Sequence, residues 1–348
     1  MIKSKFYLLS LIIPILLSSC LSQNKEQRKI DSDLLKIIFE TDIGNDVDDA
    51  MALDMLYKYI DMGKIDLLSV MINKEGEYSA LFTNIMNNWY GYPNIPIGIV
   101  HNGADSEHDA TNYAKCVVLM KNNNNEPMFQ SSQLQYAVLD EAHNLYRKIL
   151  SQQPDSSVVI VSVGFSTNLA RLLETSADEF SHLNGKELVA KKVKFLSTMA
   201  GCFNNPDHHE YNIVKDITAA KKVFAEWPTK IVTSPFEVGL QINYPATSIE
   251  NDFAWASEHP MVEAYKCYLK MPYDRPTWDL TSVLYAVEGT SYFDVSPAGK
   301  IDVTDRGSTF FNIDENGNHY YLMTDSIQSE NIKQYFINLI SKKPEKLK

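Results

Sequence analysis

The sequence predicts an α/β fold with an open, mixed but mostly parallel β-sheet and helices on both of its faces. Short β-branched and apolar runs alternate along the chain with longer segments of helical apolar spacing. The predicted strands carry continuous apolar stretches, such as Val158–Val161, rather than a strict apolar–polar alternation, which is typical of parallel strands buried on both sides. The length of 348 residues and the hydrophobic fraction of 45% are ordinary for a globular protein.

The predicted elements follow one another in order from residue 36. Strands are predicted at 36–41, 65–72, 95–100, 157–163, 193–199 and 230–233. Helices are predicted at 47–62, 78–90, 133–150, 168–175 and 217–227. Segments 309–313 and 319–323 are interpreted as a hairpin before a final helix. Ligands of such sheets bind beyond the carboxyl ends of the strands, so the residues after each strand are the candidates for a site.

The first 33 residues are not expected to belong to this fold. Residues 1–19 combine two lysines with a short apolar stretch that ends in two serines before Cys20. This pattern is typical of a bacterial lipoprotein signal, with Cys20 as the lipidated residue. An ordinary secretory signal and a short buried helix are the alternatives. Residues 20–33 would then form a tether, and residues 34–348 a single domain.

The residues directly after Cys20 are Leu21 and Ser22, which carry no acidic retention signal. This favours a cell-envelope lipoprotein anchored at the outer membrane and facing the periplasm. We expect its only attachment to the membrane to be the lipid, because no later apolar run reaches the length of about 18 residues that a spanning helix needs.

Charge and cysteine content exclude several classes of function. The chain has 32 basic and 44 acidic residues, a net charge of −12 without a basic run, which argues against a nucleic-acid partner. The remaining cysteines, Cys116, Cys202 and Cys267, lack the spacing of a zinc site. Because a chain of this size can build its core without disulfides, we expect three mostly buried free thiols.

The acidic segment 40–50, ETDIGNDVDDA, is the strongest candidate for a site. Its carboxylates would repel one another without a bound cation or proton, and oxygen ligands at this density suit Ca²⁺ or Mg²⁺. The segment lacks the glycine and glutamate positions of an EF-hand loop. In a purely structural alternative, Asp46 caps the next helix, and Asp48 and Asp49 complement its dipole, which leaves Asp42 unexplained.

This segment resembles the Asp-rich loop, D-x-D-P-G-x-D-D-A, of the inosine–uridine-preferring nucleoside hydrolase family. It differs from the family pattern in three places. Glu40 replaces the leading aspartate, Ile43 replaces the proline, and Asn45 and Asp46 are inserted.

Three later segments resemble the same family in the same order. Segment 161–170 resembles its G-x-L-T-N-(LI)-A turn, and segment 195–212 its Met-Gly-Gly strand end followed by Asn and Glu-Phe-Asn. Segment 277–280 resembles its His-Asp pair, with Trp278 in place of the histidine. The matched part of the chain extends from about residue 37 to residue 287, and it implies a nucleoside hydrolase-like fold.

The resemblance implies a role for each matched residue. It implies Asp42 as the general base. The implied Ca²⁺ ligands are Asp42, Asp49, Asp279 and the backbone carbonyl of Thr167. The implied substrate contacts are Asp48, Asn73, Asn204, Glu210 and Asn212. The family histidine helps the base to leave, whereas an indole donates only through its ring N–H, so we expect Trp278 to stack on the nucleobase instead.

The implied function is calcium-dependent hydrolysis of the N-glycosidic bond of a small-molecule ribonucleoside, which gives ribose and the free base. Two alternatives remain open because the histidine is missing. One is a calcium- and ribonucleoside-binding lipoprotein without turnover. The other is a hydrolase of another N-riboside, such as nicotinamide riboside, whose pyridinium leaves without protonation. The sequence decides neither the base preference nor whether the chain forms a homo-oligomer.

Other sources of the leaving-group proton are sought near the predicted strand ends. His101 and His108 follow a predicted strand, and Tyr273 and Arg275 lie just before Trp278, although Arg275 would stabilise negative charge rather than donate a proton. The adjacent His208 and His209 are expected to be surface-loop residues, since neighbouring histidines cannot easily share one metal ion.

Overall fold

The computed structural model describes residues 34–104, 112–132 and 134–345. The chain divides into a first unit, Met1–Leu34, and a second unit, Leu35–Lys348, to which all the elements below belong. The predicted signal sequence, Cys20 and the tether lie outside the described residues, as does His108. Within the described ranges, no helix is long and apolar enough to cross a membrane.

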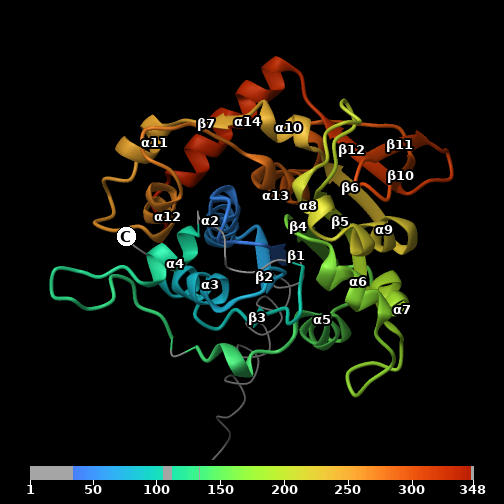
Figure 1. Cartoon of the computed structure of the whole chain (residues 1–348), viewed down its shortest axis with the longest axis horizontal. Coiled ribbons are helices and arrows are strands. Elements are labelled where there is room, and N and C mark those ends of the chain that lie inside the picture. The colour runs from blue at the N-terminus through green and yellow to red at the C-terminus, as the bar shows by residue number, and fades with distance from the viewer. Residues whose placement is uncertain (1–33, 105–111, 133, 346–348) are drawn as a thin grey trace, which may run out of the picture. The chain divides into compact units, whose positions relative to one another are not determined.

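The described part of the second unit is built on a ten-stranded sheet with the order β11-β10-β12-β6-β5-β4-β1-β2-β3, in which β9 also pairs with β12 (Figure 1). The run from β12 to β3 is parallel throughout, whereas β10 is antiparallel to β11 and β12. The strands are β1 (Leu35–Thr41), β2 (Ile65–Ile72), β3 (Ile97–Gly98), β4 (Val158–Ser162), β5 (Val193–Met199), β6 (Lys230–Ser234), β9 (Asp294–Val295), β10 (Gly299–Val303), β11 (Thr309–Ile313) and β12 (His319–Met323).

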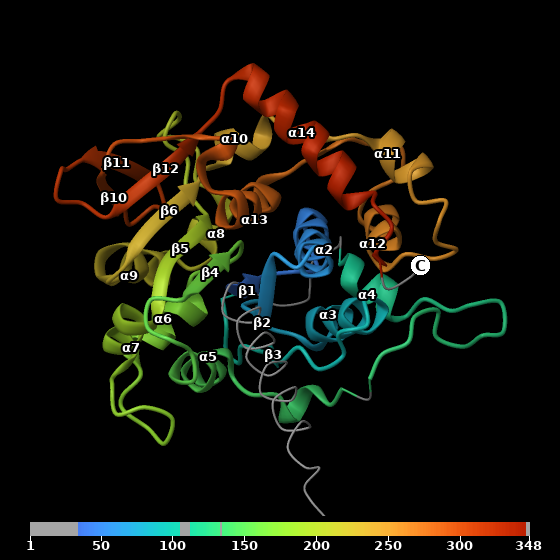
Figure 2. The ribbon, with the colours of Figure 1, turned by 180° about the vertical axis from the view of Figure 1, so that it is seen from behind.

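Helices cover both faces of this sheet (Figures 1 and 2). On one face lie α2 (Asp48–Asp61), α3 (Glu77–Trp89), α4 (Tyr113–Val118), α10 (Phe236–Leu240), α11 (Ala246–Asn251), α12 (Pro260–Tyr268), α13 (Trp278–Glu288) and α14 (Ser326–Ile340). On the other face lie α5 (Ala142–Ser151), α6 (Thr167–Glu174), α7 (Gly185–Lys192) and α9 (Ile217–Glu226). The mixed, mostly parallel sheet with two helical layers confirms the predicted fold class.

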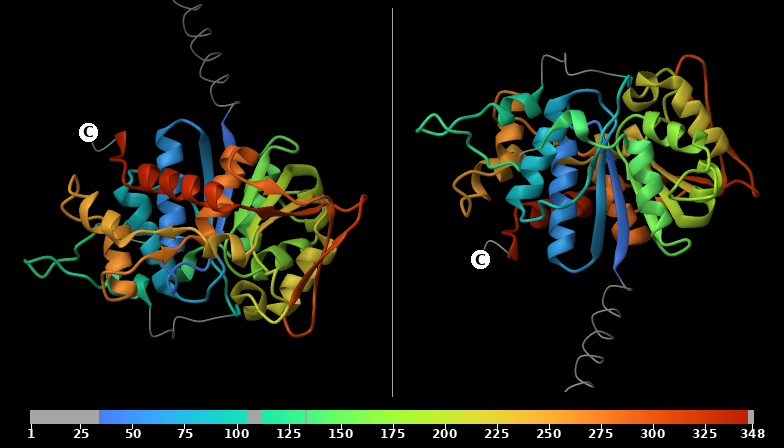
Figure 3. Two further views of the ribbon diagram at one scale, coloured as in Figure 1. Left: turned by 90° about the horizontal axis from the view of Figure 1, so that it is seen from above. Right: turned by 90° about the horizontal axis from the view of Figure 1, so that it is seen from below.

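The alternation of side chains along β1 produces these two layers. Ile37 and Phe39 belong to the core beneath α2 and α13, whereas Ile38 belongs to the core beneath α5 and α6. All three side chains are completely buried. Figure 3 shows β1 and β2 as blue strands that run side by side, and this common direction brings their carboxyl ends to one edge of the sheet.

The predicted long helix at 133–150 is wrong in its first half. Residues 136–138 form a short 3₁₀ turn, and the α-helix begins only at Ala142. Ile99 forms a parallel bridge with Glu141, and its carbonyl accepts a hydrogen bond of 2.7 Å from the Ala142 N–H. Pairing with the edge of the sheet therefore holds the chain extended where its apolar spacing predicted a helix.

The predicted hairpin of segments 309–313 and 319–323 is also wrong. Both strands exist, but β10 lies between them in the sheet. The order arises because β10 pairs along its whole length with β11 and contacts β12 through Gly299 and His319.

The prediction of three free thiols is corrected by a disulfide between Cys116 on α4 and Cys267 on α12. These two residues are 151 positions apart in the sequence. Their pairing depends on the packing of α4 against α12. Cys202 is free and buried, as expected.

Candidate active site

A cavity of about 520 Å³ lies at the carboxyl ends of the central strands. Asp42 lines it directly after β1, Val163 directly after β4, and Met199 as the last residue of β5. The starts of α2 and α13 contribute Asp48, Asp49, Trp278 and Asp279 to the same lining. This is the position in which open α/β sheets bind their ligands.

Three carboxylates of the cavity are close enough to share one cation. Asp48, Asp49 and Asp279 each offer an oxygen, and these oxygens lie within 4.8 Å of one another. All three side chains are buried, and this burial raises the pKa of each well above its usual value. Repulsion by neighbouring aspartates raises the pKa of each further.

Neighbouring backbone and hydroxyl groups fix the directions of two of these carboxylates. The Thr41 hydroxyl donates a hydrogen bond to Asp49, and Asp48 accepts one of 3.1 Å from the Asp279 N–H. The second bond joins the start of α2 to the start of α13. Buried carboxylates that face one another and are oriented in this way fit a hard divalent cation, which would stabilise their charged forms.

Asp42 lies against Gly164, at a point where only glycine leaves enough room. A Cβ atom at Gly164 would lie 2.7 Å from Asp42 Oδ1 and 2.5 Å from Asn73 Oδ1. Asn73 is fully buried and is not among the residues that line the cavity. Its amide donates to Glu40 and to the Phe165 carbonyl, at 3.1 and 2.9 Å. Asn73 therefore lies behind the loop that carries Asp42.

Glu40, the first departure from the family pattern, has a structural explanation. Its carboxyl group accepts a hydrogen bond of 2.5 Å from the Tyr146 hydroxyl on α5, besides the one from Asn73. The residue is completely buried, and this raises the pKa of Glu40 to about 7. Glu40 thus connects β1 to α5 beneath the cavity.

The inserted residues Asn45 and Asp46 form part of the cavity wall. The Asn45 amide donates to the Tyr211 hydroxyl at 3.1 Å, and its oxygen accepts from Lys74 at 3.2 Å. Asp46 forms a two-pronged ion pair with Arg275. Its capping contact with the N–H at the start of α2 measures 3.5 Å, so the ion pair is its main interaction.

Arg275 connects this ion pair to the aromatic part of the wall. Its guanidinium carbon lies 4.9 Å from the ring centre of Tyr268 and 5.0 Å from that of Trp278. Both rings line the cavity. Cation–π contacts of this kind hold the faces of aromatic rings in place.

Trp278 stacks on Phe236, with ring centres 5.5 Å apart and an angle of 21° between the rings. Its indole N–H donates to the Phe236 carbonyl at 2.9 Å. The Phe236 ring in turn packs on His208, with centres 3.9 Å apart. His208 and His209 lie in a loop at the surface, as predicted, and both also line the cavity.

Glu210 and Asn212 also line the cavity. Glu210 caps the short helix α8 (Tyr211–Lys215) and accepts three backbone hydrogen bonds, including one of 3.0 Å from Gly201. Burial raises the pKa of Glu210 to about 7. The Asn212 amide donates to the Val163 carbonyl at 3.0 Å. Two residues expected on the ribose side therefore lie at the cavity.

Two other predicted residues lie elsewhere. Asn204 is exposed, accepts from the Cys202 thiol at 3.4 Å, and is not among the lining residues. The Thr167 hydroxyl donates to Asp216 at 2.7 Å, and both residues line a separate depression. Of the residues that follow β4, Val163 lines the cavity and Thr167 does not.

Sequence reasoning missed several lining residues: Val163, Met199, Tyr211, Phe236 and Tyr268. Phe236 follows directly after β6 and Pro235, so the rule that sites lie at strand ends could have found it. Tyr268 lies at the end of α12, where no strand end or motif points to it.

The open α/β sheet and the buried carboxylates at its carboxyl edge are consistent with a nucleoside hydrolase-like fold. The model of the family described as inosine-uridine preferring nucleoside hydrolase matches residues 37–334, and the chain belongs to this family. It is therefore an enzyme of the class that acts on N-glycosyl bonds.

Solved structures of nucleoside hydrolases share the fold. A plant nucleoside hydrolase, PpNRh1, has 18% identity and a TM-score of 0.67, over 90% of this chain and 98% of its own. A purine-preferring ribonucleoside hydrolase from Gardnerella vaginalis has 16% identity and a TM-score of 0.66, over 88% and 98%. An inosine-uridine preferring nucleoside hydrolase from Bacillus anthracis has 16% identity and a TM-score of 0.63, over 88% of this chain and 99% of its own. A search of curated proteins gave no match.

Proposed function

We propose that this protein hydrolyses the N-glycosidic bond of ribonucleosides with the help of Ca²⁺. The observation that carries the proposal is a single cavity in which Asp42, three clustered aspartates and an aromatic wall meet. Its volume of about 520 Å³ is in the range of small-molecule sites, and a nucleoside needs both a polar end for ribose and a flat apolar end for the base.

The residues that would hold the ion are Asp42, Asp49 and Asp279, with Asp48 beside them. Asp48, expected as a ribose contact, belongs by distance to the same cluster as Asp49 and Asp279. Val163 lines the cavity and is a better candidate than Thr167 for a backbone oxygen ligand. Bound Ca²⁺ supplies positive charge that binds sugar hydroxyls and lowers the pKa of water.

The chain's own residues would supply the remaining chemistry. The bond breaks through an oxocarbenium-like ribosyl cation, which the surrounding carboxylates stabilise electrostatically. Asp42 would take the proton of the attacking water. Glu210 and Asn212 would bind the sugar, while Trp278 and Phe236 would hold the base by stacking.

The test measures free ribose from inosine, uridine, adenosine, p-nitrophenyl riboside and nicotinamide riboside, with and without a calcium chelator. We expect chelation to remove turnover and added Ca²⁺ to restore it. Asp42→Asn should lower kcat by at least about 10²-fold, since a general base contributes about 10² to 10⁴-fold. Asp155→Asn, at an exposed aspartate that precedes β4 and does not line the cavity, is the matched control.

The alternatives from the sequence predict different results in the same assay. A binding protein would gain thermal stability from Ca²⁺ and nucleoside but release no ribose from any substrate. A hydrolase limited to ribosides whose leaving group needs no proton would act on nicotinamide riboside and p-nitrophenyl riboside but not on inosine, uridine or adenosine. The type III effector protein XopQ has a similar fold, with 14% identity and a TM-score of 0.61 over 92% of this chain and 98% of its own. Its structure was solved in complex with adenosine diphosphate ribose, so this ribose-containing molecule is added to the panel.

We also propose that the protein is a lipoprotein of the cell envelope that faces the periplasm. The disulfide between Cys116 and Cys267 supports an oxidising compartment, since cytosolic proteins rarely keep such bonds. Labelled fatty acid should be incorporated into the full chain but not into a Cys20→Ser variant. Labelling of both equally would contradict this assignment.

A further inference from the structure

The proposed reaction requires a proton for bases that leave poorly, and the indole of Trp278 cannot supply it. Its only N–H is donated to the Phe236 carbonyl, 2.9 Å away. Among the described residues that line the cavity, the imidazoles are those of His208 and His209. An imidazole is the side chain most often used as a general acid near neutral pH.

The His208 ring continues the aromatic row that begins beside the carboxylates. Trp278 precedes Asp279 in the chain, Phe236 stacks on Trp278, and His208 packs on Phe236 with an angle of 30° between the rings. A ribose bound at the aspartates would direct its base along this row. His208 would then lie at the far end, next to the departing base.

The loop that carries His208 has a defined conformation. The Gly201 N–H donates to Glu210 at 3.0 Å, which closes the loop, and the Phe203 N–H donates to Glu237 at 3.0 Å. The His208 N–H donates to the Asn205 carbonyl at 3.1 Å. His208 is half-buried, whereas His209 is exposed. Of the two imidazoles, His208 is therefore the one held in a fixed place.

We propose that His208 is the general acid that protonates the leaving base, an inference that rests on the proposed nucleoside hydrolysis. The electron pair of the C1′–N bond passes to the base, which takes a proton from the His208 imidazolium. The water oxygen bonds to C1′, and the water proton passes to Asp42. Exchange with solvent then returns a proton to His208 and removes one from Asp42.

The test compares two substrates that differ in their need for an acid. Inosine needs protonation of its base, whereas p-nitrophenolate leaves without it. We expect His208→Gln to lower kcat/KM for inosine by at least about 10²-fold and to change that for p-nitrophenyl riboside by less than about threefold. Retained activity on p-nitrophenyl riboside also shows that the variant is folded and that the rest of the site works.

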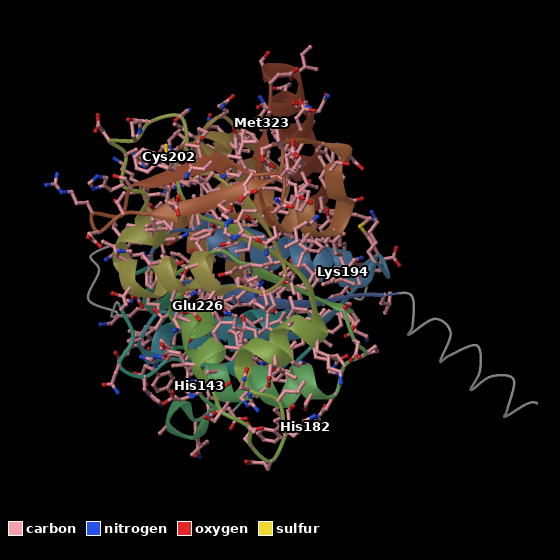
Figure 4. All side chains as sticks on the ribbon, turned by 90° about the vertical axis from the view of Figure 1, so that its right-hand side faces the viewer. His143, His182, Lys194, Cys202, Glu226 and Met323 are labelled. Carbon is pink, nitrogen blue, oxygen red and sulfur yellow. A yellow bond between two sulfur atoms is a disulfide. The ribbon has the colours of Figure 1, made fainter. Side chains whose placement is uncertain are left out.

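Two further variants sharpen the comparison. His209→Gln tests the adjacent imidazole, and His182→Gln is a control in an exposed loop, at the opposite side of the domain from Cys202 in Figure 4. Equal losses on both substrates in His208→Gln would overturn the proposal, because they indicate a structural role. A selective loss on inosine in His209→Gln alone would overturn it as well. If the unmodified protein released ribose from neither substrate, the proposed hydrolysis itself would fail.

Discussion

Removal of the disulfide between Cys116 and Cys267 should lower the free energy of unfolding by an amount that its loop length sets. The bond closes a loop of 151 positions between α4 and α12. In the chain-entropy model a loop of this length corresponds to about 5 kcal/mol, and native disulfides usually contribute about 2–4 kcal/mol. We expect Cys116→Ser/Cys267→Ser to lose about 2–4 kcal/mol, below the chain-entropy value, because the reduced unfolded chain keeps residual structure that lowers the entropic term.

The same change should reach the proposed site. Tyr113 on α4 forms two hydrogen bonds with Gly44, which lies in the loop after Asp42. The Tyr113 hydroxyl accepts from the Gly44 N–H at 3.1 Å, and the Tyr113 N–H donates to the Gly44 carbonyl at 3.0 Å. The disulfide holds α4 in this position. Ribose release by the double variant should therefore decline at temperatures at which its fold is still intact.

The assay is urea unfolding of the chain without residues 1–30, with and without reductant. Tryptophan fluorescence reports the folded fraction. Reductant should destabilise the unmodified protein and Cys202→Ser, but not the double variant. The denatured, unreduced protein should expose one reactive thiol, that of Cys202, and three after reduction. Three thiols before reduction, or equal stability with and without reductant, would refute the reasoning.

Three other changes test the charges of the molecule. Asp279→Asn should raise the melting temperature of the metal-free protein by relieving repulsion, and should reduce the rise caused by added Ca²⁺; an unchanged rise would argue against its role as a ligand. Asp46→Asn should raise KM by about fivefold, since a partly exposed ion pair contributes about 1 kcal/mol, and leave kcat nearly unchanged. Burial lowers the pKa of His319 to about 4, so below pH 6.5 the unfolded chain binds more protons than the folded one. The free energy of unfolding should therefore fall by about 3 kcal/mol between pH 6.5 and pH 4. In acid unfolding curves, His319→Gln should remove this contribution to the pH dependence.

The sequence allowed the central strands to be predicted because burial on both faces leaves consecutive apolar residues, as in Ile37–Phe39 and Val158–Val161. The edges of the sheet were harder to predict. Strand β10, GKIDV, alternates buried and exposed residues and carries two charges, so its apolar signal is weak. Its insertion between β11 and β12 depends on long-range pairing, which local patterns do not contain.

Some residues of the candidate site could likewise be predicted from local sequence, and others could not. Residues that directly follow strands or begin helices, such as Asp42, Asp49 and Asp279, lie at the cavity that the topology predicts. Thr167 lies elsewhere, because the turn after β4 brings Val163 rather than the helix start to the cavity. The disulfide could not be predicted, since the approach of α4 to α12 joins segments 151 positions apart.

The departures from the family pattern depend on one another in the structure. The insertion supplies Asp46, Asp46 binds Arg275, and the Arg275 guanidinium lies over the ring of Trp278. The indole is further held by the Phe236 carbonyl. A histidine at position 278 would keep Arg275 beside it, and a nearby guanidinium disfavours the protonated imidazole that an acid requires. The loop insertion and the tryptophan at position 278 are thus linked through Arg275, and under the proposed function the leaving-group proton would come from another residue of the wall.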